Sequence, residues 1–200
     1  VDPVDGTTNF AHGHPFFCLS MGLAQGLELL AGIVLAPALR SEWTAVRGGR
    51  AERDRSPRRV SATTEISDAL LATGFPARRA SVADNNYRSF LSLDAKSHGV
   101  RRCGAAAMEL ALVADGSYDA FWDLGLKPWD LAAGALLVRE AGGTVTDMEG
   151  LPLALSRGRI LASNGALHAS MVEALTGALP LPPIAGMTHE AGLQGPEEVG

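Results

Sequence analysis

Cysteine is scarce in this chain of 200 residues: the two that occur, Cys18 and Cys103, stand far apart and form no CxxC pair. Without that spacing the sequence has neither a zinc-ligand motif nor a disulfide framework. Such cysteine usage favours the reducing cytoplasm as the location. Long hydrophobic runs are missing as well: the longest, Leu29–Leu39, contains Pro37 and is shorter than the roughly 20 residues that cross a bilayer. The sequence therefore argues against a membrane protein.

Positive charge is also sparse. The 17 lysines and arginines are outnumbered by 22 acidic residues, which gives a net charge of −5. The one arginine-rich stretch, residues 47–59, also carries Glu52 and Asp54. A face that binds nucleic acid needs clustered positive charge to displace counterions from the phosphates, so we expect no nucleic-acid partner.

The chain does have enough apolar sequence for a core, since 46% of its residues are hydrophobic and 20% are charged. The first half is typical of strands joined by glycine-containing turns, with a hairpin at Gln25-Gly26. Residues 1–5 are interpreted as a buried strand; because the chain begins inside it, we expect the natural N-terminus to lie upstream. The polar residues 47–59 are interpreted as a surface loop. Strands are predicted at Phe16–Leu23, Gly32–Leu35 and Trp43–Val46.

The second half alternates between helical and extended patterns. Helices are predicted at Ala105–Ala114, Trp129–Ala141 and Ala166–Leu179, and strands at Tyr118–Trp122, Gly143–Asp147 and Arg159–Ala162. A first half rich in strands, followed by a second half in which helices and strands alternate, predicts a layered α+β or α/β fold. We expect it to form one domain over residues 1–179. Residues 180–200, rich in Pro, Gly and Glu, are predicted to form a disordered tail.

The most informative stretch is Asp-Pro-Val-Asp-Gly-Thr-Thr-Asn at residues 2–9. Asp2 and Asp5 flank a rigid proline, and carboxylate and carbonyl oxygens suit Mg²⁺. Gly6 permits an unusual backbone angle, and Thr7 favours a helix start whose free N–H groups suit a phosphate. A metal-held phosphate is one interpretation; the other is a strand ending in an Asp-Gly turn, with Asp5 and Thr8 as capping residues.

A second stretch, residues 121–134, places Asp130 at the start of a helix after Pro128. Simple capping explains an aspartate there, and the small residues Ala132, Ala133 and Gly134 are typical of tight helix packing. Asp130 becomes a candidate metal ligand only if the fold brings it to Asp2 and Asp5, which sequence spacing alone does not establish.

Together the two stretches resemble the inositol monophosphatase family of Mg²⁺-dependent phosphatases. Residues 2–10 match the motif D-P-[IVL]-D-G-T-x-N-[FY], and residues 129–134 match W-D-x-A-[AG]-[AG]. Residues 102–107 and 140–143 resemble further family segments, and the sequence of residues 121–130 is most similar to the bacterial branch of the family. The resemblance implies an αβαβα sandwich like that of inositol monophosphatase and fructose-1,6-bisphosphatase. It also implies a cytoplasmic homodimer acting on a small phosphorylated polyol.

The resemblance further implies roles for individual residues. Mg²⁺ would be bound by Asp2, Asp5, Asp130 and the carbonyl oxygen of Val4, with Asp5 and Thr7 as the catalytic residues. The Thr7 hydroxyl would position the attacking water. The substrate would be bordered by the following residues: Asp5, Gly6, Thr7, Gly104, Ala105, Ala106, Asp123 and Asp130.

Three departures from the family pattern stand beside these matches. Asp123 occupies a position where the family typically has Glu, residues 50–57 are more charged than the usual turn, and no upstream Glu-Glu motif precedes Val1. If the N-terminal helices are missing with that motif, one sheet face with the apolar residues of Phe16–Leu23 would be uncovered and this chain would be weakly active or inactive. The open alternatives are a phosphatase for histidinol phosphate, fructose bisphosphate or phosphoadenosine phosphate, and a non-catalytic remnant.

Overall fold

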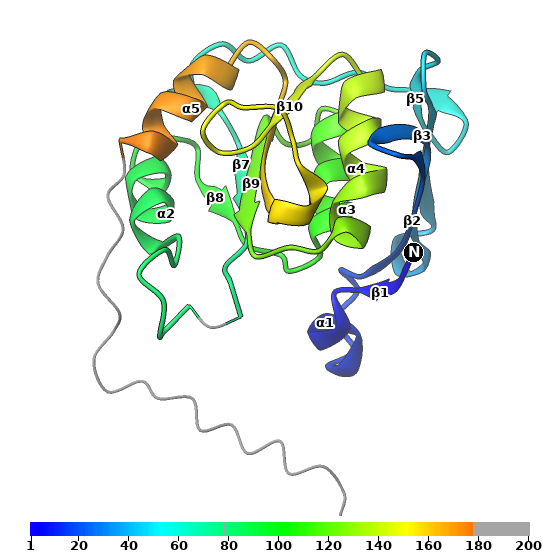
Figure 1. Cartoon of the computed structure of the whole chain (residues 1–200), viewed down its shortest axis with the longest axis horizontal. Helices are drawn as coiled ribbons and strands as arrows, with labels where there is room; N and C mark the ends of the chain where they lie inside the picture. The colour runs from blue at the N-terminus through cyan, green and yellow to red at the C-terminus, as the bar shows by residue number, and fades with distance from the viewer. Residues whose placement is uncertain (78, 178–200) are drawn as a thin grey trace, which may run out of the picture.

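The computed structural model describes residues 1–77 and 79–177. Within them, two β-sheets and two pairs of longer helices form four layers in the order sheet, helices, sheet, helices (Figure 1). The strand-rich first half builds the first sheet and the alternating second half builds the rest. The predicted layered α+β fold is confirmed.

The first sheet is an antiparallel meander of strands in sequence order. Alternating side chains point to its two faces: on β3 and β4, Val34 and Trp43 are buried on the inner face, whereas Ile33 and Val46 are exposed on the outer face. The predicted hairpin at Gln25-Gly26 joins the second and third strands, with Gly26 at φ 61°. Its strands are β1 (Asp2–Asp5), β2 (Cys18–Gln25), β3 (Glu28–Ala36), β4 (Ser41–Val46), β5 (Ala51–Arg53) and β6 (Ser56–Pro57).

Two predictions about this sheet are wrong. The arginine-rich stretch 47–59 is not a loop but contains β5 and β6, because Ala51 is buried opposite Ala45 and the charged residues find partners. Arg53 stacks on the Trp43 ring at 4.8 Å and donates to Asp115 at 2.9 Å. Residues 1–5 do form a strand, but it lies at the edge of the sheet, so only its last residue, an aspartate, is buried.

The second sheet has the strand order β10-β11-β9-β7-β8 within the described residues. β7 runs parallel to β8 and β9, and the other pairs are antiparallel. The sequence predicted β9, β10 and β11 but not β7 or β8, which are only three and two residues long and depend on their neighbours for pairing. The strands are β7 (Leu71–Thr73), β8 (Val100–Arg101), β9 (Ala120–Leu124), β10 (Thr144–Thr146) and β11 (Arg159–Ser163).

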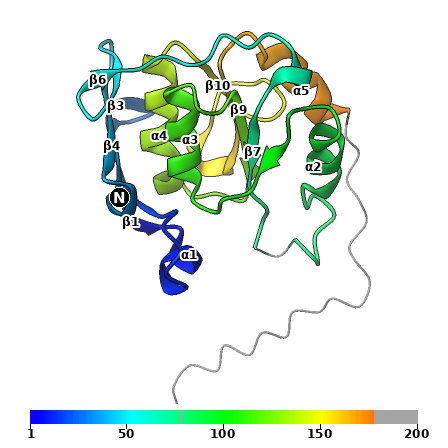
Figure 2. The same ribbon diagram turned by 180° about the vertical axis from the view of Figure 1, so that it is seen from behind.

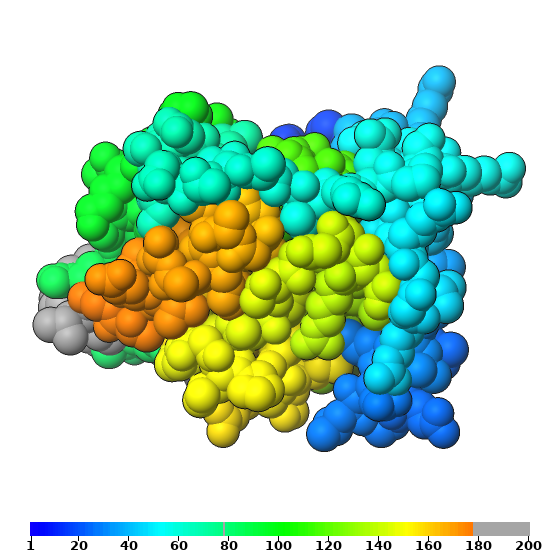
Figure 3. Space-filling view, turned by 90° about the horizontal axis from the view of Figure 1, so that it is seen from above, coloured from blue at the N-terminus to red at the C-terminus, as the bar shows by residue number. Residues whose placement is uncertain are grey.

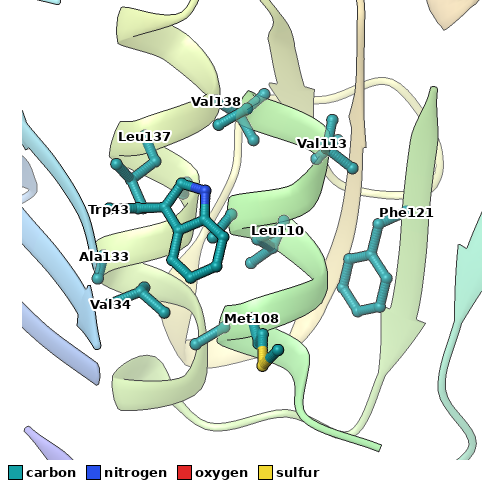
Figure 4. Packing of buried hydrophobic residues seen from close by; sticks show 14 of the residues in the cluster. Val34, Trp43, Met108, Leu110, Val113, Phe121, Ala133, Leu137 and Val138 are labelled. Atoms are coloured by element: carbon teal, nitrogen blue, oxygen red, sulfur yellow. The ribbon is translucent and has the colours of Figure 1, made fainter. Parts of the chain in front are cut away.

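Helices α3 (Ala106–Ala114) and α4 (Pro128–Glu140) fill the space between the sheets, as predicted within one residue at each end. Figure 4 shows how Trp43 from the first sheet, Leu110 and Leu137 from the helices and Phe121 from the second sheet share one core. The helix and sheet backbones approach closely because Gly22 and Gly32 pair directly across β2 and β3. A Cβ added at Gly22 would lie 2.6 Å from that of Ala132. The packing role predicted for the small residues of α4 is confirmed.

The remaining layer consists of α2 (Tyr87–Asp94) and α5 (His168–Thr176), which cover the far face of the second sheet (Figure 2). Their residues pack with Leu71, Trp122 and Leu161 in a second apolar cluster. Seen from above, α5 in orange and the first sheet in blue to cyan lie on opposite sides of α4 (Figure 3). The predicted end of the last helix at Leu179 and the predicted tail 180–200 lie outside the described residues.

No described helix or strand covers the outer face of the first sheet, which forms one side of the molecule in Figure 1. This face carries Met21 and Leu23 on β2, and their exposed fractions are 37% and 60%. Ile33, Leu35 and Val46 continue the apolar surface across β3 and β4. The predicted exposure of apolar residues on this sheet is therefore confirmed. None of the described helices is long and apolar enough to span a membrane.

Candidate active site

The two sheets and the helices between them enclose a pocket of about 830 Å³ at one end of the molecule. It opens between β1 and the short helix α1 (Thr7–Ala11) on one side and the loop after β7 on the other, and both lie at the same end in Figure 1. Every residue predicted for the site lines this one pocket: Asp2, Val4, Asp5, Gly6, Thr7, Gly104, Ala105, Ala106, Asp123 and Asp130.

Gly6 connects β1 to α1 and is the N-cap of that helix, with φ at 87°. A Cβ there would lie 3.0 Å from the carbonyl oxygen of Phe16 and 3.2 Å from the Cβ of Ala105, so the backbone conformation and the space both favour glycine. β1 does end in the predicted Asp-Gly turn, but no side chain caps α1, so Asp5 and Thr8 are not the capping residues of that helix.

Asn9 fastens α1 to the segment that precedes α3. Its side-chain amide donates to the carbonyl oxygen of Phe16 at 2.6 Å and to that of Cys103 at 2.7 Å. These two bonds hold residues 2–9 against residues 103–105, although almost one hundred residues separate them in the sequence. Asn9, which lies inside α1, thus joins two walls of the pocket.

Asp5 is buried at the end of β1, where its Oδ2 accepts a hydrogen bond of 2.7 Å from the N–H of Ala107. That N–H belongs to the first turn of α3, so Asp5 caps a helix distant in sequence. Burial raises the pKa of Asp5 to about 7; the Ala107 N–H opposes the rise, and the charges of Asp130 and Asp2 add to it. The carboxylate is therefore held in a site that lacks compensating positive charge.

Asp130 lies close to Asp2 in the pocket and is also part of the first turn of α4. Its Oδ2 accepts a hydrogen bond of 2.8 Å from the N–H of Lys127, the N-cap residue, so the carboxylate satisfies a backbone donor at the start of α4. Burial raises the pKa of Asp130, and the neighbouring Asp2 raises it further. The capping interpretation of Asp130 is correct, and Asp130 also lines the same pocket as Asp2 and Asp5. That the three carboxylates share metal ions stays a prediction.

Asp123 lies on β9, on the side of the pocket away from β1, and is 5% exposed. Its Oδ1 accepts a hydrogen bond of 2.6 Å from the N–H of Leu124. Its Oδ2 lies 1.9 Å from where a Cβ of Gly74 would be, so only glycine at the end of β7 leaves room for this carboxylate. Burial raises the pKa of Asp123 to about 7, against the opposing effects of the Leu124 N–H and the Arg102 charge.

Sequence reasoning missed Glu109, Gly74 and Arg79, which also line the pocket. Glu109 is 1% exposed, and its carboxylate accepts a hydrogen bond of 2.9 Å from the N–H of Cys103, so it holds the loop before α3. A single charged residue in the otherwise apolar sequence AAMELALVA was a signal that could have identified it. Gly74 and Arg79 follow β7, where no periodic pattern gave a signal.

The side chains of Asp2, Asp5 and Asp130 offer hard oxygen atoms to the pocket, which Val4 also lines. Within the described residues, no three histidine, cysteine, aspartate or glutamate side chains are close enough to enclose one metal ion on their own. Mg²⁺ does not require such a cage, because it is usually held by one or two carboxylates together with water and substrate phosphate. The raised pKa values of Asp5 and Asp130, neither of which forms an ion pair within the described residues, fit a divalent cation.

The sequence model of the inositol monophosphatase family matches residues 1–179, so this chain belongs to that family. An inositol-1-monophosphatase from Synechocystis is 45% identical over 88% of this chain and 61% of its own length. Nus factor SuhB from Pseudomonas aeruginosa is 44% identical over 90% of this chain and 67% of its own. A solved structure of an inositol monophosphatase from Anabaena superposes with a TM-score of 0.88 at 44% identity, covering 90% of this chain and 74% of that one. The chain thus spans about two thirds of these relatives.

Proposed function

We propose that this chain hydrolyses a phosphate monoester of a small polyol, with myo-inositol monophosphate as the leading substrate and Mg²⁺ as the cofactor. The observation that carries the proposal is the meeting of Asp2, Asp5 and Asp130, from two separate sequence motifs, in one pocket. If the aspartates of the two motifs only capped two separate helices, nothing would require them to line the same pocket.

In this proposal Asp2, Asp5, Asp130 and the carbonyl oxygen of Val4 hold the cofactor. Bound Mg²⁺ would supply positive charge to the phosphoryl oxygens and lower the pKa of a nearby water. Asp5 is kept in position by the Ala107 N–H, which also favours its ionised form. These residues supply negative charge at one place, which a divalent cation offsets.

The phosphate itself would be held at the start of α1. The first intrahelical bond runs from the N–H of Phe10 to the carbonyl oxygen of Gly6, so the N–H groups of the preceding turn have no acceptor within the helix. Those of Gly6 and Thr7 would face the phosphate oxygens, and the Thr7 hydroxyl would orient the attacking water. A cysteine nucleophile is not needed: burial and the charges of Asp5 and Asp2 raise the pKa of Cys18, which disfavours its thiolate.

Gly104, Ala105, Ala106 and Asp123 would border the alcohol part of the substrate. Histidinol phosphate, fructose bisphosphate and phosphoadenosine phosphate are the alternatives to inositol phosphate. If Asp123 accepts a substrate hydroxyl, Asp123→Ala will lower kcat/KM for hydroxyl-bearing substrates by roughly 10- to 100-fold and change the order of preference. An equal loss with every substrate would instead assign Asp123 a structural role.

The activity is tested by phosphate release from a panel of these esters at saturating Mg²⁺. Thr7→Ala is expected to lower kcat by about 100-fold while KM changes little, because a hydroxyl that orients water acts mainly in the transition state. Thr44→Ala, on the outer face of β4, is the matched control and should leave both constants unchanged. No release with any ester would favour the non-catalytic remnant over the enzyme. The homodimer and the cytoplasmic location stay predictions.

A further inference from the structure

β1 brings two acidic residues to one pocket, although a regular strand would turn them to opposite faces. Side chains alternate along a strand, so residues three apart, such as Asp2 and Asp5, would point in opposite directions. The register against β2 is irregular, however: Asp2 pairs with Ser20 and Asp5 with Cys18, so three steps along β1 match two along β2. A β-bulge of this kind adds one residue to a strand and re-aims its side chains. Both carboxylates therefore line the same pocket.

The bulge is satisfied within β1 and holds Asp2 in place. Pro3 has no N–H that could be left unpaired. The N–H of Val4 donates to Oδ1 of Asp2 at 3.0 Å, so the carboxylate accepts the backbone donor that the irregular register frees. Asp5 is held separately by the N–H of Ala107 at the start of α3. Neither of these bonds involves α4, which carries Asp130.

Ser20 is the residue that connects β2 to the start of α4. It is fully buried, and its hydroxyl donates to the carbonyl oxygen of Trp129 at 3.2 Å. Trp129 directly precedes Asp130 in the first turn of α4, and Ser20 is the cross-strand partner of Asp2. Within the described residues, this is the only hydrogen bond between β2 and α4. One side chain thus links the strand pair that carries Asp2 to the turn that carries Asp130.

The position of Ser20 in the strand explains why the bond matters. Its neighbours on the inner face of β2 are Cys18 and Gly22, and Gly22 lets the backbone of α4 approach at Ala132. Van der Waals contact of this kind sets the distance between strand and helix, but it is not directional. A buried hydroxyl is costly unless it has a partner, so the bond from Ser20 favours one position of α4 along the strand.

We propose that Ser20 is a positioning residue of the metal site: it holds the first turn of α4 against β2, so that Asp130 stays beside Asp2 and both can bind the same cation. Ser20 itself is not among the described residues that line the pocket, and it acts through the backbone of Trp129. This inference rests on the proposed Mg²⁺-dependent function, which it deepens by naming the contact that joins the two halves of the site.

The test is calorimetric titration of Mg²⁺ into wild type and Ser20→Ala. We expect the Kd for Mg²⁺ to rise by about 2- to 10-fold in the variant, the value of one hydrogen bond. Ser41→Ala is the matched control, because Ser41 is a buried serine of the same sheet that donates to Asp54 at 3.2 Å and lies outside the pocket lining. It also loses a hydrogen bond, but its Kd for Mg²⁺ should equal that of wild type.

Equal Mg²⁺ affinities in wild type and Ser20→Ala, or an equal loss in Ser41→Ala, would overturn the inference. If the wild-type chain binds no Mg²⁺, the proposed function fails, and hydrogen exchange of the metal-free chain still decides the role of Ser20. Faster exchange of the amides of residues 129–133 in Ser20→Ala, but not in Ser41→Ala, supports that role. Unchanged exchange in this turn overturns it.

Discussion

The two sheets of this molecule differ in how many of their faces are covered. In the second sheet, Trp122 and Leu161 are fully buried, because α3 and α4 pack on one face and α2 and α5 on the other. In the first sheet the described helices cover only the inner face, and the outer face carries Leu23, 60% exposed, and Leu35, 39% exposed. Both sheets are rich in apolar residues, so hydrophobic composition alone does not distinguish a covered face from an open one.

The difference bears on the pocket, since each sheet supplies part of it. Asp2 and Asp5 come from the edge strand of the half-covered sheet, whereas Asp123 comes from a central strand of the covered one. α4 joins the two, because its backbone packs on Gly22 and Gly32 and its first turn carries Asp130. The open face is an apolar surface of the kind that marks an interaction site or promotes association.

The largest difference in unfolding free energy is expected when one leucine is truncated to alanine in each sheet. Leu161→Ala creates a cavity in the covered sheet and should lower the free energy of unfolding by about 2–5 kcal/mol. Leu35→Ala, on the open face, should change it by less than about 0.5 kcal/mol. Urea unfolding followed by circular dichroism measures both. Similar losses in the two variants would mean that something covers the outer face in solution.

A smaller difference in stability is expected between substitutions on the two faces of one strand. Gly32→Ala on β3 would place a methyl group 2.9 Å from the carbonyl oxygen of Ala133, so α4 has to shift, at a cost of about 1–3 kcal/mol. Ala31→Val, one residue away on the outer face, adds two methyl groups and should cost less than about 0.5 kcal/mol. Thermal melts of the two variants give the answer, and a stable Gly32→Ala variant would refute the close helix–sheet contact.

The buried carboxylate of Glu109 gives a smaller, pH-dependent effect. Burial raises its pKa well above 4.5 in the folded chain, so the folded state holds this proton to a higher pH than the unfolded chain does. The contribution of the Glu109 carboxyl to the free energy of unfolding is therefore complete below about pH 4.5, and it is lost as the pH rises toward the pKa of the folded chain. Glu109→Gln keeps an acceptor for the Cys103 N–H without the charge, and should be more stable than wild type at pH 8. The gap should shrink at pH 5; a gap that is equal at both pH values would contradict the account.

Sequence reasoning reached the parts of the fold that have strong local patterns. The periodicity of α3 and α4 and the motifs around Asp5 and Asp130 predicted the central layer and the acidic cluster of the pocket. It failed where structure depends on distant partners: β5 forms because Ala51 pairs with Ala45 and Arg53 stacks on Trp43. The same holds for Gly74 and Arg79, whose places in the pocket are set by parallel pairing of β7 with its neighbours.

The central claim is that the aspartates from both parts of the molecule form one Mg²⁺-dependent phosphatase site. The most direct measurement is phosphate release from myo-inositol 1-phosphate with saturating Mg²⁺ and with EDTA, for wild type, Asp130→Asn and the exposed control Asp68→Asn. The account predicts release only with Mg²⁺, a loss of at least about 100-fold in Asp130→Asn and no change in Asp68→Asn. Release that persists in EDTA, or an Asp130→Asn variant as active as wild type, would contradict it.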